Sequence, residues 1–369
     1  DNVTRGQTRL FEKNLDRLYR AIWLDDVIAY YTEHAQDYDR VLDIFVRANE
    51  GGTKLSKSDL LLSMVTAKWA SVNARDEIFS LVQQLNDELN RRNDFDKDFI
   101  MKTCLVLTDL PVVYRVNNFN NQNLALIESA WPRIRDAIVR TVRLVNSFGI
   151  DRDTLTSANA LIPIVYYLYQ RKGVTLDGSS YSDVMDARRI RRWLTMALLN
   201  GAFSGQSDTA LTETRAVLRD AVGQPEFPVQ SLTTALAKSG RVAAFDEAAI
   251  ANFLDTEYGD REAFLALSLL YDQHQWTSLV HHQDHIFPKS LFSPERLAAS
   301  GRSADQQMRY RTLVNRIGNL ELLSAPENLE KLNKPFDEWL PTRHPDFKSR
   351  HLIPDDPTLY SFDRFEEFI

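Results

Sequence analysis

Apolar residues recur every three or four positions through most of the first 259 residues, which is the period of an amphipathic helix. In the segment 123–146, for example, Ile134, Ile138, Val142 and Val145 fall on one side. Short breaks rich in Gly and Asn separate the segments, and the chain carries no internal repeat. The pattern predicts helices over residues 2–23, 25–32, 74–92, 97–107, 123–146, 157–171, 182–200, 209–222 and 245–254. Ser56 or Ser58 should cap a further helix, whose core face is formed by Leu60, Leu61, Met64 and Val65.

The pattern changes near the C-terminus. Residues 278–287 alternate apolar and polar positions, and residues 318–323 read Gly-Asn-Leu-Glu-Leu-Leu, so both are expected to be short strands. A helix should follow, because Ser324 is a suitable N-cap and Glu327, three residues on, completes a capping box. Pro335 should end this helix.

One face of this helix should contact the first strand. Asn328 and Lys331 are three positions apart and therefore share a face. Asp284 and His285 of the hairpin can face these two residues. The expected result is a ββα unit that grips one metal ion. The buried side of the helix should be formed by Leu329 and Leu332.

Four polar residues in this unit suggest a chemistry. Asp284 is an acid that can hold a hard cation, and His285 places an imidazole beside it. Asn319 and Asn328 follow, nine positions apart. This set is sufficient for metal-assisted attack on a phosphodiester.

The same residues carry a family resemblance. Asp-His-Ile-x-Pro, Gly-Asn-Leu and Asn-x-x-Lys, spread over about residues 278–340, resemble the HNH (ββα-metal) endonucleases, in the variant found at the C-terminus of GmrSD-like, modification-dependent restriction enzymes. About thirty residues separate Pro288 from Asn319, a longer gap than a compact HNH unit needs. We interpret residues 304–316 as an inserted helix.

The resemblance implies a role for each motif residue. Asp284 and Asn328 would bind the metal, Mg²⁺ or Mn²⁺, and His285 would be the general base. Asn319 would brace the loop, and Lys331 would lie near the scissile phosphate.

A second resemblance lies near the N-terminus. Residues 44–56, which read Ile-Phe-Val-Arg-Ala-Asn-Glu-Gly-Gly-Thr-Lys-Leu-Ser, resemble the end of the ParB-like domain of the same proteins. The Asp-Gly-Gln-Gln-Arg signature expected upstream is absent, so no nucleotide-binding residue is assigned. For Arg47 and Asn49, the alternative to a place in such a domain is a turn with a salt bridge. The chain lacks a starting Met and a signal peptide, which indicates a fragment or a processed protein.

Composition and charge narrow the class of protein. Of the 369 residues, 44% are hydrophobic and 26% charged, as in ordinary globular proteins, and no apolar run has the length of a membrane span. Cys104 is the only cysteine, which excludes an internal disulfide and a multi-cysteine zinc site and fits a cytoplasmic protein. The net charge of −7 disfavours DNA binding by the chain as a whole. The segment 281–350 is weakly basic, however, because it holds 11 Lys and Arg against 9 Asp and Glu.

Several basic side chains are candidates for contacts to DNA. In the C-terminal unit these are His282 and Lys289, although His282 is as well explained as a solvated histidine. The densest basic cluster consists of Arg188, Arg189, Arg191 and Arg192. It would form a phosphate-contacting surface or, as we slightly favour, a solvated helix face paired with Asp183 and Asp186. No role is assigned to His274, His344 and His351.

The sequence thus predicts a mainly α (α+β) protein. Residues 1–67 would be the remnant of a ParB-like domain, 68–259 a helical domain and 260–369 an HNH nuclease domain. The expected function is metal-dependent nicking or cleavage of DNA, with modified phage DNA as the partner in bacterial defence. The alternative is a non-catalytic module that senses DNA or binds a partner through a degenerate HNH site. We expect no membrane partner and leave open a homo-oligomer.

Overall fold

The computed structural model describes residues 4–25, 32, 34, 40, 44, 57–69, 71–113, 118, 120–171, 174, 176, 178, 180–244, 247–271 and 280–369. The chain divides into two compact units, residues 1–55 and 56–369. Most of the helix predicted at 25–32, Arg47, Asn49 and His274 lie outside the described residues. The division of the chain into three functional domains at residues 67 and 259 stays a prediction.

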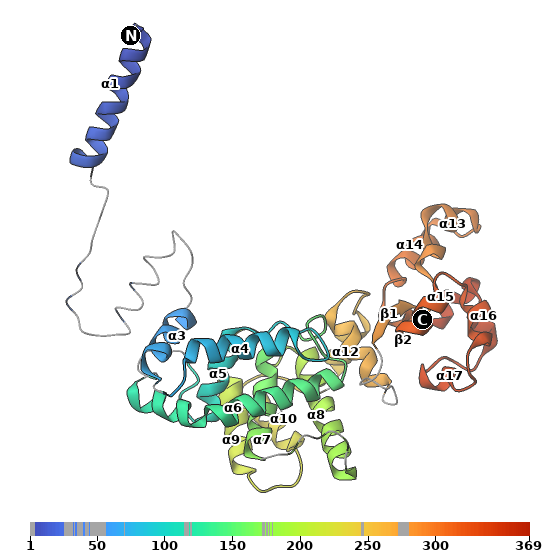
Figure 1. Ribbon diagram of the computed structural model, residues 1–369. Helices are drawn as coiled ribbons and strands as arrows, with labels where there is room; N and C mark the ends of the chain where they lie inside the picture. Colours follow the sequence, from blue (N-terminus) through green and yellow to red (C-terminus); the bar gives the residue numbers. More distant parts are fainter. Residues whose placement is uncertain are drawn as a thin grey trace. The chain divides into compact units, whose positions relative to one another are not determined.

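The first unit contains helix α1 (Arg5–Tyr19), which continues as a short π-helix, η1 (Arg20–Leu24) (Figure 1). Thr4 begins α1 with a capping box, because its side chain accepts from the backbone N–H of Gln7 and the Gln7 side chain bonds back. The helix predicted over residues 2–23 is therefore confirmed.

Helices make up the first part of the second unit. Their bounds are α3 (Lys57–Lys68), α4 (Ala74–Asp87), α5 (Lys97–Leu107), α6 (Asn121–Ser147), η3 (Ala158–Leu161), α7 (Ile162–Gln170), α8 (Tyr181–Leu199), α9 (Asp208–Asp220), α10 (Val229–Lys238), α11 (Glu247–Leu254) and α12 (Arg261–Leu270). The helices predicted between residues 74 and 254 are confirmed, with ends that differ by a few residues. None of the described helices is long and apolar enough to cross a membrane.

Two of these helices were missed by the periodicity. Helix α10 is short and follows a break at Gly223–Pro228. Helix α12 reads Arg-Glu-Ala-Phe-Leu-Ala-Leu-Ser-Leu-Leu and is buried continuously from Ala263 to Ser268. A helix covered on more than one side loses the three-to-four period of an amphipathic helix. Here the covering elements are α8 and the second strand of the C-terminal sheet.

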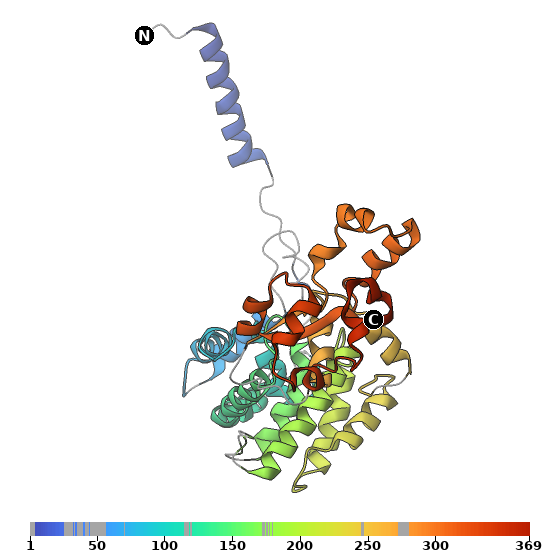
Figure 2. The ribbon, with the colours of Figure 1, turned by 90° about the vertical axis from the view of Figure 1, so that its right-hand side faces the viewer.

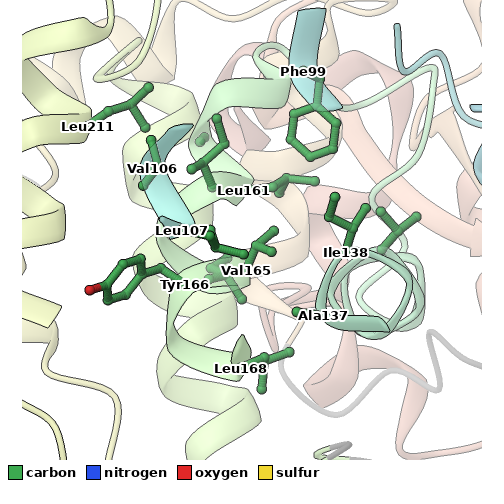
Figure 3. Packing of buried hydrophobic residues seen from close by; sticks show 14 of the residues in the cluster. Phe99, Val106, Leu107, Ala137, Ile138, Leu161, Val165, Tyr166, Leu168 and Leu211 are labelled. Atoms are coloured by element: carbon green, nitrogen blue, oxygen red, sulfur yellow. The ribbon is translucent and has the colours of Figure 1, made fainter. Parts of the chain in front are cut away.

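The core of the helical part surrounds α7. Every residue from Ile162 to Leu168 is buried, as expected for a helix that is apolar all round. Helices α5, α6 and α9 pack against it. Figure 3 shows side chains of these four helices meeting, with Val165 of α7 among Leu107 of α5 and Ala137 and Ile138 of α6. This packed core is the support on which α8 and α12 rest.

The C-terminal part, orange to red in Figures 1 and 2, contains a two-stranded antiparallel sheet. Strand β1 (His281–His285) pairs with β2 (Leu320–Ser324), and Asp284 lies opposite Glu321. The segment between the strands forms η4 (Lys289–Phe292), α13 (Pro294–Ala299), α14 (Ala304–Leu313) and η5 (Ile317–Asn319). Both predicted strands and the inserted helix are thus confirmed, with narrower bounds.

Helix α15 (Ala325–Lys331) follows β2 directly, and its capping box of Ser324 and Glu327 is confirmed. Pro335 does not end this helix but caps α16 (Phe336–Trp339). The remaining elements are η6 (Leu340–Thr342), α17 (Phe347–Arg350), η7 (Pro357–Tyr360), η8 (Phe362–Arg364) and α18 (Phe365–Phe368). Together with residues of the insertion they form a second core, rich in Phe, which includes Leu323 of β2.

The prediction that Leu329 and Leu332 form the buried side of α15 is wrong. Leu329 and Leu332 are 73% and 67% exposed, whereas Lys331 is fully buried. The helix is only seven residues long. The side of α15 that faces the hairpin contacts the carboxylates of Asp284 and Glu321. Lys331 therefore occupies the buried position that the apolar pattern had predicted for leucine.

We expect Leu194→Ala in α8 to lower the free energy of unfolding by about 2 to 5 kcal/mol, because it removes a fully buried side chain and leaves a cavity. Leu126→Ala in α6, at a position 46% exposed, should change it by less than about 0.5 kcal/mol. Urea denaturation followed by circular dichroism measures both. Similar effects of the two substitutions would contradict the packing described here.

Candidate functional site

The ββα unit brings together the motif residues of the C-terminal part. Asp284 and His285 end strand β1, and Asn319 immediately precedes β2. Asn328 and Lys331 lie on α15, which packs on both strands. Three elements that are separate in sequence therefore meet at the end of one hairpin.

Asn319 fixes the chain that leaves β1. Its side chain is fully buried. Its Oδ1 accepts from the backbone N–H of Phe287 at 2.9 Å, and its Nδ2 donates to the carbonyls of Val314 at 2.8 Å and Phe287 at 3.2 Å. Its own carbonyl accepts from the N–H of Ile286 at 2.8 Å. These bonds hold the two residues after His285 against the start of β2, so Asn319 positions the site and does not itself reach solvent.

Lys331 joins both strands to α15. Its Nζ donates to Oδ2 of Asp284 at 2.7 Å, to the carbonyl of His285 at 2.6 Å and to Oε1 of Glu321 at 2.6 Å. All three ammonium protons are therefore satisfied within the protein. The expectation that Lys331 lies near the scissile phosphate stays a prediction; in the structure the buried ammonium binds three protein acceptors.

Glu321 is the buried partner of this ammonium. Burial by itself raises the pKa of the Glu321 carboxyl, but the charge of Lys331 and the neighbouring His351 outweigh burial, so the pKa lies below its usual value. Nδ1 of the buried His351 lies 3.4 Å from Oε2 of Glu321. Asp284 and Glu321 both contact the ammonium of Lys331, and of these two carboxylates Asp284 is the partly exposed one, with 21% of its side chain exposed.

His285 is held from two sides. Its Nε2 lies 3.0 Å from Oδ1 of Asn315, and the ring of Tyr258 lies against the imidazole, with centroids 4.5 Å apart. Burial lowers the pKa of His285 from 6.5 and outweighs the hydrogen bond with Asn315 and the charge of Asp284, which raise it; the charges of Lys289 and Lys331 lower it a little further. His285 is therefore neutral at pH 7, as a general base must be.

Residues 247–356 match the family model described as the C-terminal domain of GmrSD restriction endonucleases. This segment, which we call the GmrSD-type domain, is similar to that C-terminal domain. It contains the whole ββα unit, the inserted helices and His351. No curated protein matches the chain. The match does not extend to the N-terminal segment, so the ParB-like interpretation of that segment stays a prediction.

The GmrSD-type domain contains site residues that the sequence analysis missed: Tyr258, Asn315, Glu321 and His351. Only Glu321 gave a signal, since it is a charged residue within the apolar run Leu-Glu-Leu-Leu. The other three act through contacts with residues far away in sequence.

The basic residues divide into two groups. Of the four arginines on α8, Arg188 and Arg192 are exposed and stand four positions apart on one face. Arg189 pairs with Glu226 at 2.8 Å, and the buried Arg191 donates to the carbonyl of Ser268 in α12. Within the GmrSD-type domain His282 and Lys289 are exposed. Arg191 thus connects two helices, which removes it from the set of candidate phosphate contacts.

We expect Lys331→Met to lower the free energy of unfolding by about 3 to 5 kcal/mol, because it leaves the buried Glu321 carboxylate without its cation. The double substitution Lys331→Met and Glu321→Leu should cost less than the single one, since it removes both buried charges. Chemical denaturation at pH 7 compares them. A double variant at least as unstable as Lys331→Met would show that the ion pair does not dominate at this position.

His285 should make stability depend on pH. Its pKa in the folded state is lower than the ordinary value of 6.5, so the unfolded chain binds the proton more readily. Its contribution to stability is complete above pH 6.5 and is lost as the pH falls toward and through the lowered pKa. Denaturation at pH 7.5 and pH 5 should therefore show a smaller loss in a His285→Gln variant than in the parent. Equal losses would contradict the buried, neutral imidazole.

Proposed function

We propose that this chain is a metal-dependent endonuclease that nicks or cleaves DNA, with its centre at Asp284, His285 and Asn328. The observation that carries the proposal is the ββα unit in a GmrSD-type domain, in which a carboxylate and a neutral imidazole occupy the last two positions of β1. A neutral imidazole next to a carboxylate is the pair that general-base attack by water on a phosphodiester needs.

The residues present fit a hard divalent cation, Mg²⁺ or Mn²⁺. In the group formed by Asp284, Glu321 and Lys331, the carboxylate of Asp284 is the partly exposed one. Asn328 stands one turn before Lys331 on the same face of α15, and Lys331 already contacts Asp284. Asp284 and Asn328 would hold the ion through oxygen atoms, the ligands that such cations prefer. When bound, the ion would offset charge that develops on the phosphate.

The ligand set is small. Within the parts of the chain that the structure describes, no three His, Cys, Asp or Glu side chains are placed to hold a metal together. One carboxylate and one amide oxygen leave the other coordination positions to water and phosphate oxygens, which is common for Mg²⁺.

Each of the chain's own groups has a defined part. His285 accepts a proton from the attacking water, which its neutral form allows. Lys331 fixes the carboxylate of Asp284, and Asn319 fixes the backbone after His285. His282 and Lys289 on the GmrSD-type domain, and Arg188 and Arg192 on α8, would contact DNA phosphates.

The matching family is described as restriction endonucleases, which supports a role in restriction. We infer that the substrate is modified phage DNA and that the protein acts in the bacterial cytoplasm. One such centre cuts one strand, so a double-strand break would need two copies or two events. A non-catalytic module that senses DNA or binds a partner is the alternative. It is disfavoured because the structure retains the Asp284–Lys331 contact and the Asn319 brace intact.

The test is cleavage of supercoiled plasmid by the purified chain with Mg²⁺ or Mn²⁺. We expect His285→Ala to lower the rate by about 10² to 10⁴-fold without loss of DNA affinity, because it removes the base. His344→Ala is the matched control, since that imidazole is exposed and pairs with Asp346 outside the site. Matched plasmid and modified phage DNA then test the substrate.

The metal ligand should respond differently. Asp284→Asn keeps an oxygen for Lys331 but removes the charge, so excess Mg²⁺ or Mn²⁺ should restore part of its activity. No metal concentration should restore His285→Ala. Cleavage by His285→Ala at the parental rate, or the absence of cleavage by the parent on every substrate, would refute the proposed function.

A further inference from the structure

The insertion between the two strands ends in a residue that reaches the catalytic imidazole. After α14 the chain turns at Val314–Arg316 before η5 begins. Asn315, half-buried in this turn, places its Oδ1 3.0 Å from Nε2 of His285. The long segment between Pro288 and Asn319 thus returns to the site through a side chain.

The backbone of the same residue holds the other neighbour of His285. The carbonyl of Asn315 accepts from the N–H of Tyr258 at 2.8 Å, and the Tyr258 ring lies against the imidazole at an interplanar angle of 35°. A second bond, from the N–H of Ile317 to the carbonyl of Thr256 at 3.1 Å, ties the two segments together. The imidazole of His285 therefore contacts Asn315 at its edge and Tyr258 on its face.

The contact at the edge selects one form of the imidazole. An amide oxygen can only accept a hydrogen bond, so the nitrogen that faces it must carry the proton. A neutral imidazole has one N–H, and a proton on Nε2 leaves the lone pair on Nδ1. The nitrogen that would take a proton from water is then Nδ1.

We propose that Asn315 is a positioning residue that holds His285 in the Nε2–H form and keeps Nδ1 available to the reacting water, with Tyr258 restricting rotation of the ring. The inference rests on the proposed function. In the step it serves, Nδ1 takes the water proton as the water oxygen bonds to phosphorus. The electron pair of the broken P–O bond leaves with the departing oxygen, which is protonated by solvent.

A purely structural role for the Asn315 side chain is separable from this one. The turn is held by backbone bonds, because the carbonyl of Asn315 accepts from Tyr258 and the N–H of Arg316 donates to the carbonyl of Leu313. These bonds remain when the side chain is replaced. Asn315→Leu removes the acceptor at similar size, and Asn315→Asp keeps an oxygen facing Nε2. Thr312→Ala is the control, since the Thr312 hydroxyl is exposed and donates to the carbonyl of Met308, one turn earlier in α14.

The first experiment observes the tautomer directly. In protein labelled with ¹⁵N-histidine, the His285 signals are identified by their loss in His285→Gln, and their shifts show which ring nitrogen carries the proton. We expect Nε2–H in the parent, in Asn315→Asp and in Thr312→Ala, and a mixture of tautomers in Asn315→Leu. An Nδ1–H form in the parent, or an unchanged tautomer in Asn315→Leu, would overturn the proposal. This measurement does not depend on cleavage, so it stands even if the proposed function fails.

The second experiment is a double-mutant cycle on plasmid cleavage. Asn315→Leu should lower kcat about 10 to 100-fold with KM for DNA changed less than about twofold, since the base is disordered but binding is not. Asn315→Asp should keep kcat within about tenfold of the parent, because it retains the acceptor. In a His285→Ala background Asn315→Leu should cost nothing more, since there is no imidazole left to position. An equal loss in both backgrounds would mean that Asn315 acts on the fold and not on His285.

Discussion

One ammonium group joins all three elements of the ββα unit. Lys331 comes from α15, Asp284 and the His285 carbonyl belong to β1, and Glu321 belongs to β2. Removing a lysine and a glutamate from water costs several kcal/mol for each ion, and only close contacts to several partners offset that cost. The orientation of the helix on the hairpin is therefore tightly restricted, because a shift of either one leaves a buried charge without its partner.

The same contact places the reactive residues. Asp284 and His285 are adjacent in β1, and the ammonium of Lys331 binds the side chain of the first and the carbonyl of the second. On the other side of the strand end, Asn319 bonds the backbone of Phe287, two residues beyond His285. The imidazole thus projects from a stretch of chain that is fixed before and after it, while Asp284 keeps one side toward solvent.

The support for this unit comes from outside the motif. Helix α12 packs on α8 and on β2, and Arg191 of α8 donates to the carbonyl of Ser268 in α12. The segment from Thr256 to Asp260 lies between α11 and α12 and bonds both to the turn at Asn315 and to Gln283 of β1. Helix α12, which belongs to the GmrSD-type domain, therefore connects that domain to α8 of the helical part, and the segment that precedes α12 forms the surroundings of His285.

The sequence by itself determined most of the helices, the two strands, the inserted helix and the capping box of Ser324 and Glu327, because periodicity and caps depend on residues within one or two turns of each other. The motif residues could be chosen for the same reason, since Asp284 and His285 are neighbours and Asn319 and Asn328 have a fixed spacing. Tertiary structure decided which side chains are buried and which distant residues they contact. It buried Lys331 and exposed Leu329 and Leu332, and it separated Arg191 from Arg188 and Arg192. It also brought Asn315, Tyr258 and His351 to the site. Burial of a charge depends on whether distant partners can satisfy it, and that information is not present in any local pattern.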